Sequence, residues 1–187
     1  MTMMRDFAGA ERAFRLGYGE IMDLETACGE VALATIYKSF GAFDWKITYV
    51  FQVLRIALIG GGMRSDEARS LVKERVDAGR IGELMTLAFD ILIETLEGAP
   101  KAEGASSGGE ATPIDRGLVY KSFAEVGIPP QEVDAMEFAK VLHLYAALGR
   151  DGKGAPPSPE EFAEMRARVD SGALDWSLQP ETKGDRS

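Results

Sequence analysis

Few side chains in this sequence have the type and spacing that catalysis needs. The chain has one histidine, His143, and one cysteine, Cys28. One imidazole cannot build a site that needs several histidine ligands, and a Ser-His-Asp arrangement could form only around His143. The acidic neighbours of Cys28, which are Asp23, Glu25 and Glu30, favour the thiol over the reactive thiolate. We expect both side chains to pack rather than react, and we predict no enzyme, cofactor or metal site.

The run Gly60-Gly61-Gly62 invites comparison with a phosphate-binding loop, because backbone amides at a helix start can hold an anion. A Walker loop follows a strand and ends in Gly-Lys-Ser or Gly-Lys-Thr. Here Met63-Arg64-Ser65 follows a predicted helix, and no such lysine is present. We therefore predict a tight turn between two helices, with a small anion site at Arg64 as the alternative.

Composition excludes several classes of protein. The 187 residues, 45% hydrophobic and 27% charged, suit one ordinary domain with a smaller appended module. A net charge of -9 disfavours nucleic acid as a partner, because phosphates are bound mainly by Lys and Arg. One cysteine allows no intrachain disulfide, and no apolar run has the length of a signal peptide core or a membrane span. We expect a cytoplasmic protein of a bacterial host cell, with no membrane partner.

Hydrophobic spacing predicts a hairpin and then helices in residues 1–98. The hairpin is expected over residues 7–16 with its turn at Gly9. Apolar residues at intervals of three and four then predict five helices. These are expected over residues 20–28, over residues 33–40, over residues 45–59 after an N-cap at Asp44, from an N-cap at Ser65 to a break near Gly79, and over residues 83–97.

The helix predicted over residues 45–59 is apolar on more than one side. One stripe contains Ile47, Val50, Phe51, Leu54 and Leu58, and a second line contains Tyr49, Val53 and Ile56. Such a helix is either central to a bundle or has apolar surface that binds a partner. The second line and the glycines that follow the helix are therefore candidate partner-binding residues: Tyr49, Val53, Ile56, Gly60, Gly61 and Gly62.

A change of composition predicts a second module. Residues 99–113 are expected to form a flexible linker, because residues 99–112 carry no large apolar side chain. Residues 114–170 are expected to form a small helical module. Its predicted elements are helices over residues 114–126 and 136–148, joined by a turn at Gly127-Ile128-Pro129-Pro130, and a helix begun by the capping box Ser158-Pro159-Glu160-Glu161. Residues 171–187 are expected to be disordered, although Trp176 lies in an apolar cluster typical of a docking peptide.

The predicted fold is therefore mainly α: a small N-terminal β-hairpin, a helical bundle, and a linker-tethered helical C-terminal module. Within the first hundred residues, the order of several short motifs resembles a known family. These motifs are Phe14-Arg15-Leu16, Gly19-Glu20-Ile21, Leu24-Glu25, Val53-Leu54-Arg55, Leu58-Ile59-Gly60-Gly61-Gly62, Ala68 and Leu71-Val72. They are similar to the N-terminal part of the tail assembly chaperones of gene transfer agents and siphophage-like particles, a family also labelled as tail tube proteins.

A fainter similarity concerns the second module. Gly127-Ile128-Pro129-Pro130-Gln131-Glu132-Val133, followed by the Phe138 helix, resembles a small protein usually encoded just downstream, although that protein has a large aromatic residue where residues 133–135 stand here. This similarity implies that the chain joins both pieces, as the frameshift-extended chaperones of tailed phages do.

The resemblance implies a tail assembly chaperone of a tailed phage or gene transfer agent-like particle. Such a protein binds the tape measure protein, keeps it soluble, helps to recruit tail tube subunits, and is absent from the finished particle. The alternatives are a structural tail tube protein and a generic helical protein-binding module. A tube subunit needs long strands, and the sequence shows no convincing strand pattern after Leu16. Self-association into a homo-oligomer is left open by the sequence.

Overall fold

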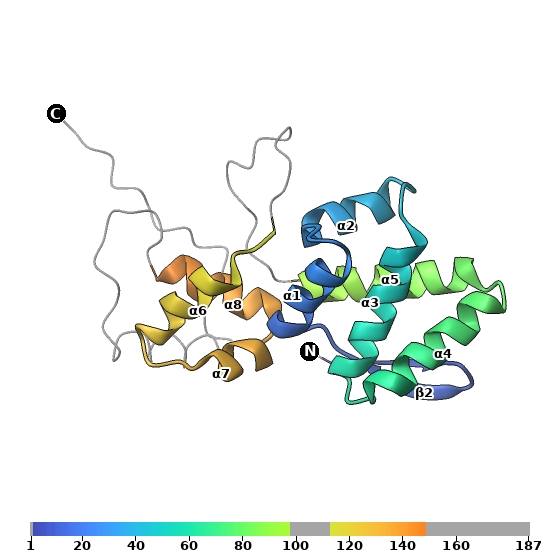
Figure 1. The fold of residues 1–187 in the computed structure, drawn as a ribbon, viewed down its shortest axis with the longest axis horizontal. Coiled ribbons are helices and arrows are strands. Elements are labelled where there is room, and N and C mark those ends of the chain that lie inside the picture. Colours follow the sequence, from blue (N-terminus) through green and yellow to red (C-terminus); the bar gives the residue numbers. More distant parts are fainter. Residues whose placement is uncertain (1, 98–112, 149–187) are drawn as a thin grey trace.

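The computed structural model describes residues 2–97 and 113–148, and within these ranges the protein is mainly helical (Figure 1). This confirms the predicted mainly α fold with an N-terminal hairpin. The described elements are β1 (Met3–Phe7), β2 (Ala10–Phe14), α1 (Tyr18–Ala27), α2 (Leu33–Gly41), α3 (Ile47–Gly60), α4 (Ser65–Asp77), α5 (Ile81–Leu96), α6 (Arg116–Ala124), α7 (Pro130–Ala135) and α8 (Phe138–Ala147).

The two strands form an antiparallel hairpin in which Met3 pairs with Phe14 and Phe7 pairs with Ala10. The turn residues Ala8 and Gly9 have φ values of 57° and 77°, which suit a two-residue turn that follows the twist of the strands. The hairpin begins at Met3, earlier than predicted. In β1 only Met3 and Phe7 are buried, so the sequence shows too little alternation to reveal the strand.

Helix α3 lies at the centre of the N-terminal part and contacts α1, α4, α5 and β2 (Figure 1). Its side chains Val50, Val53, Leu54 and Leu58 have no exposed surface. Apart from Ile47, which is 41% exposed, both apolar lines of this helix are thus used inside the protein. The over-apolar pattern that the sequence shows reflects a central helix with neighbours on several sides.

The predicted N-caps of α3 and α4 are wrong by two residues and by one residue, and α1 and α5 each begin two residues earlier than predicted. Helix α3 follows an N-cap at Lys46, because the amide of Asp44 instead donates to the Ser39 carbonyl at the end of α2. Helix α4 follows an N-cap at Arg64, so that Ser65 is its first helical residue and makes no cap hydrogen bond. In both places a turn closed by backbone contacts decides where the helix begins.

Residues 113–148 contain one more helix than the sequence predicted. The segment with two prolines forms a turn and then starts the short helix α7, with Pro130 as its first residue. The N–H that proline lacks would have no partner within the helix at this position. Buried side chains of α6, α7 and α8 belong to the same hydrophobic core as those of the N-terminal part, and α7 packs on α1. The predicted linker, the Ser158 capping box and residues 171–187 lie outside the described residues.

Candidate functional site

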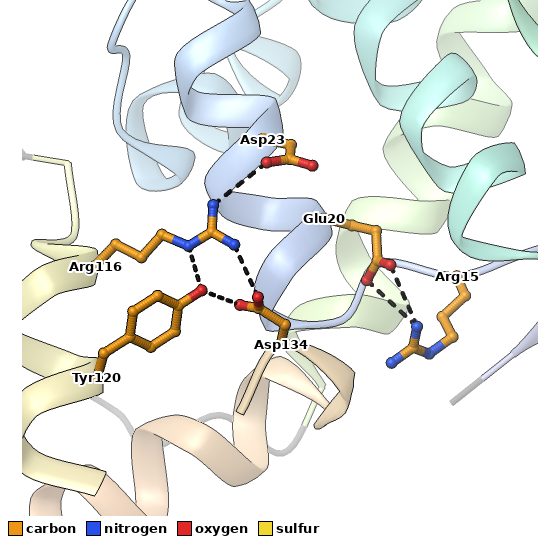
Figure 2. A network of polar contacts seen from close by, with 6 residues as sticks. All are labelled: Arg15, Glu20, Asp23, Arg116, Tyr120 and Asp134. Carbon is orange, nitrogen blue, oxygen red and sulfur yellow. Dashed lines mark hydrogen bonds and ion pairs between the residues drawn. The ribbon is translucent and has the colours of Figure 1, made fainter. Parts of the chain in front are cut away.

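A cluster of charged and polar side chains lies where α6 and α7 meet α1 (Figure 2). We call this cluster the polar junction. It joins residues from the connection before α1, from α1 itself and from the two helices after residue 113. Its members are Arg15, Glu20, Asp23, Arg116, Tyr120 and Asp134.

Arg116 is the donor at the centre of the junction (Figure 2). Its guanidinium lies 2.9 Å from an Asp134 carboxylate oxygen and 3.5 Å from Asp23, and its Nε donates to the Tyr120 hydroxyl. That hydroxyl in turn donates to Asp134. Burial, followed by the bond to Asp134, raises the pKa of Tyr120, so the hydroxyl keeps its proton at neutral pH. The contacts of Arg116 therefore combine one cation, the two carboxylates of Asp23 and Asp134, and a neutral phenol.

Arg15 connects the end of the hairpin to α7. Its guanidinium lies 3.4 Å from Glu20 and donates to the carbonyl oxygen of Ala135 at 2.5 Å. Glu20 also accepts the Gly17 amide at 2.8 Å, so it caps the start of α1. A Cβ at Gly17 would lie 2.9 Å from the carbonyl oxygen of Met136, which explains why this close approach takes glycine.

Tyr18 lies beside the junction, and its hydroxyl is fully buried without a hydrogen-bond partner among the described residues. Its ring packs edge-on against Tyr120. Burial, followed by the influence of Tyr120, raises the pKa of Tyr18, so the phenol stays neutral. A buried hydroxyl that loses its hydration without gaining a partner is a cost to folding.

Replacement of Tyr18 by phenylalanine is expected to stabilise the protein. The substitution keeps the ring in the core and removes the unpaired hydroxyl, so the free energy of unfolding should rise by about 1 kcal/mol. Urea unfolding followed by circular dichroism measures this change. The Tyr120→Phe variant is the control and should lose stability, because its hydroxyl bonds both Arg116 and Asp134. A Tyr18→Phe protein less stable than the wild type would contradict the assignment.

A second buried polar contact joins the same segments through Glu25, which is 3% exposed. One carboxylate oxygen accepts the Leu33 amide at 2.7 Å, and the other accepts the Ile114 amide at 3.2 Å. Burial raises the pKa of Glu25, and the two amide bonds oppose that rise without cancelling it. Glu25 of α1 thus holds both the start of α2 and the segment before α6 in place.

The charge on Glu25 should make stability depend on pH. Because the folded pKa lies above the unfolded one, the contribution of Glu25 is fully present below about pH 4.3, the ordinary glutamate pKa, and is lost as pH rises through the raised folded pKa. The Glu25→Gln variant lacks this titration. The difference in free energy of unfolding, wild type minus variant, should therefore fall across that window and then level off. Urea titrations at several pH values test this, and a difference independent of pH would contradict it.

Neither of the two side chains best suited to catalysis in the sequence belongs to the polar junction. Burial raises the pKa of the half-buried Cys28 to about 11, so the thiol is unreactive because it is desolvated rather than because of its acidic neighbours. His143 is a half-buried residue of α8 that interacts with other residues of the protein. The arrangement of the junction is suited to holding two segments together.

The predicted partner-binding residues of α3 lie in the core. Tyr49 is 6% exposed, Val53 is 0% exposed and Ile56 is 4% exposed, so a partner could touch them only after neighbouring elements moved. Gly60 and Gly61 lie against the backbone of β2 and of the connection that follows it. Gly62 is exposed in the turn to α4, and Trp176 lies outside the described residues. A role of these residues in binding remains a prediction.

The structure shows a surface that the sequence did not single out. We call it the α5 groove: a hollow of about 200 Å³ between the hairpin, α5 and the start of α8. Its apolar lining is Met3, Phe14, Leu16, Ile91 and Phe138, and its charged lining is Glu94, Glu97, Glu137 and Arg15. Four separate segments build it, so no local pattern could predict the hollow. The spacing of Glu94 and Glu97 at the end of the predicted helix was the one available signal for its outer edge.

A family model matches the N-terminal part of the chain. The family model described as "Phage tail tube protein, GTA-gp10" matches residues 2–98. That range contains the hairpin and α1 to α5, and it ends before α6. No curated protein and no solved structure matches the chain. Within residues 2–97 and 113–148, no helix is long and apolar enough to cross a membrane.

Proposed function

The chain belongs to the family described as phage tail tube protein, GTA-gp10, and we propose that within tail assembly it acts as a chaperone that binds the tape measure protein. In this role it keeps that protein dispersed and aids the assembly of tail tube subunits around it. It works in the cytoplasm of the bacterial host, where the parts of the tail meet. Membership of a family of phage tail proteins is the premise, and the step of tail assembly at which the protein acts is what we propose.

The helical fold is the observation that carries the proposal. Within the described ranges the only sheet is the hairpin of β1 and β2. A closed β-barrel wall, as in a tube built of strands, needs many strands with matched tilt and register. A two-stranded hairpin contributes too little sheet to such a wall. Helices with grooves between them are instead suited to holding a helix of another protein.

Surface charge supports the same role. The chain carries 30 acidic and 21 basic residues, and such a net charge keeps a complex dispersed in solution. Hydrophobic side chains are also left at the surface, among them Phe43 at 80% and Ile93 at 46% exposed. A chaperone needs both properties: apolar contacts for its client and charge that prevents aggregation.

A structural tail tube subunit is the second candidate. The description of the matching family names a tail tube protein, and it therefore favours this candidate more directly than the chaperone. The two roles differ in what becomes of the protein. A tube subunit stays in the finished tail in many copies, whereas a chaperone leaves before the particle is complete.

Two measurements distinguish these candidates. The first is co-expression of the full chain with the tape measure protein encoded nearby, with an unrelated acidic protein of similar size as the control. The second is mass spectrometry of purified particles. We expect a higher soluble yield of the tape measure protein and no copies of this chain in particles. An unchanged yield, or copies of the chain in numbers that match a tube wall, would overturn the chaperone role.

A further inference from the structure

Helix α5 presents a stripe of side chains to the surface beside the α5 groove. Asp90, Ile93, Glu94 and Glu97 follow one another at helical spacing, so they share one face of the helix. Ile93 is 46% exposed, although it is a large apolar side chain. These four residues and Arg5 line a second hollow, which shares Glu94 and Glu97 with the α5 groove. Together the two hollows form one continuous surface along the helix.

The inner part of this surface is apolar. Ile91 of α5, Phe14 of β2 and Phe138 of α8 face the hollow, and all three belong to the hydrophobic core. Phe138 comes from the segment beyond the family match, and the contact of Arg15 with Ala135 holds the preceding turn in place. The groove is therefore completed only when residues 113–148 pack against the hairpin and α5.

The outer edge of this surface carries carboxylates that are only partly compensated by arginine. Glu94 pairs with Arg5 at 3.5 Å, and Arg15 is held by Glu20 at 3.4 Å. Asp90 and Glu97 are exposed, and neither forms an ion pair with a described residue. Carboxylates at the edge of an apolar groove favour a partner that brings a basic side chain to each of them.

From this arrangement we propose that the α5 groove binds an amphipathic, basic helix of a partner protein. The partner helix lies along α5, covers Ile93 with an apolar side chain, and directs Lys or Arg to Asp90 and Glu97. The floor of the hollow, Phe14 and Phe138, stays in the core, because these side chains are only 1% and 4% exposed. Helical spacing of the stripe favours a helical partner over an extended one. This inference rests on the proposed function, since it names the surface through which a chaperone holds its client.

A charge-swap experiment on the full chain tests the proposal. The probes are two synthetic amphipathic helices with the same leucine pattern, one with lysine and one with glutamate on the polar face. Binding is measured by fluorescence anisotropy. The Asp90→Lys and Glu97→Lys double variant should bind the lysine helix about tenfold more weakly than the wild type and should gain affinity for the glutamate helix.

Matched variants separate the groove from general attraction to an acidic protein. The Glu74→Lys and Glu125→Lys double variant changes the net charge equally at exposed positions on α4 and after α6, and it should bind as the wild type does. Ile93→Asp should weaken binding, whereas Leu118→Asp, at a similarly exposed position, should not. The proposal would be overturned if the two double variants lost the same affinity for the lysine helix, or if Ile93→Asp and Leu118→Asp did. It would also be overturned if the wild type did not bind the lysine helix.

The co-expression assay separates this inference from the proposed function. One result would be an equal rise in the soluble yield of the tape measure protein with the wild type and with the Asp90→Lys and Glu97→Lys variant. That result would support the chaperone role and would show that the client does not bind through the α5 groove. If the yield does not rise but the charge swap reverses the preference for the two synthetic helices, the groove stands and the chaperone role is wrong.

Discussion

Replacement of Gly61 by alanine is expected to cost about 3 kcal/mol of folding free energy or more. Gly61 follows α3 at the point where the helix meets β2. A Cβ there would overlap the carbonyl group of Ala13, and a backbone group cannot move aside as the end of a long side chain can. A cost of this size is a large part of the stability of a small domain. Thermal and urea unfolding followed by circular dichroism measures it.

Gly82→Ala is the matched control for that experiment. Gly82 lies near the start of α5, and a Cβ there would meet nothing within 4 Å. Alanine should leave stability unchanged there or raise it by up to about 1 kcal/mol, because it favours the helix. If Gly61→Ala were as stable as Gly82→Ala, the close packing of α3 on β2 would be wrong.

The Val53→Asp variant is expected to lose its fold. Val53 has no exposed surface at the centre of α3, so the substitution buries a carboxylate that has no partner. The cost should reach about 4 kcal/mol or more, which places the variant near or beyond the limit of stability. The amide spectrum from NMR should lose its dispersion. Tyr49→Asp should act in the same direction, because Tyr49 is also buried.

The same variant also tests the interpretation of Tyr49 and Val53 as a partner-binding face. On an open face, Val53→Asp would give a folded protein with weaker binding. Thr48→Asp is the control, because Thr48 is exposed in the first turn of α3, where a negative charge is favourable. A folded Val53→Asp protein as stable as Thr48→Asp would show that this part of α3 is accessible.

Local patterns predicted the helices well where one periodic stripe was present. Leu33, Ile36 and Phe40 placed α2 within a residue of its observed bounds, because they face the core from a single side. The starts of α3 and α4 were less predictable. Side chains that could cap a helix stand near both, yet backbone turns that depend on neighbouring elements decided where those helices begin.

The candidate site shows the same limit more strongly. Arg116 and Asp134 are 18 residues apart in the chain, and Arg116 and Asp23 are 93 apart, so no spacing rule could join them. The glycine run illustrates an intermediate case. Its role as a turn could be predicted from local chemistry, but the approach of Gly60 and Gly61 to β2 depends on where the hairpin packs.

The sequence alone determined the helical character of this protein and its resemblance to phage tail proteins, because periodicity and short motifs are local properties. The glycine, cysteine and histidine patterns also argued against a catalytic site without any structure. Only the tertiary structure decided which apolar faces are used in the core and which remain open. Tyr49 and Ile93 are both apolar or aromatic residues on helices, yet Tyr49 is 6% exposed and Ile93 is 46% exposed. Burial depends on what packs against a residue, and those neighbours come from distant parts of the chain.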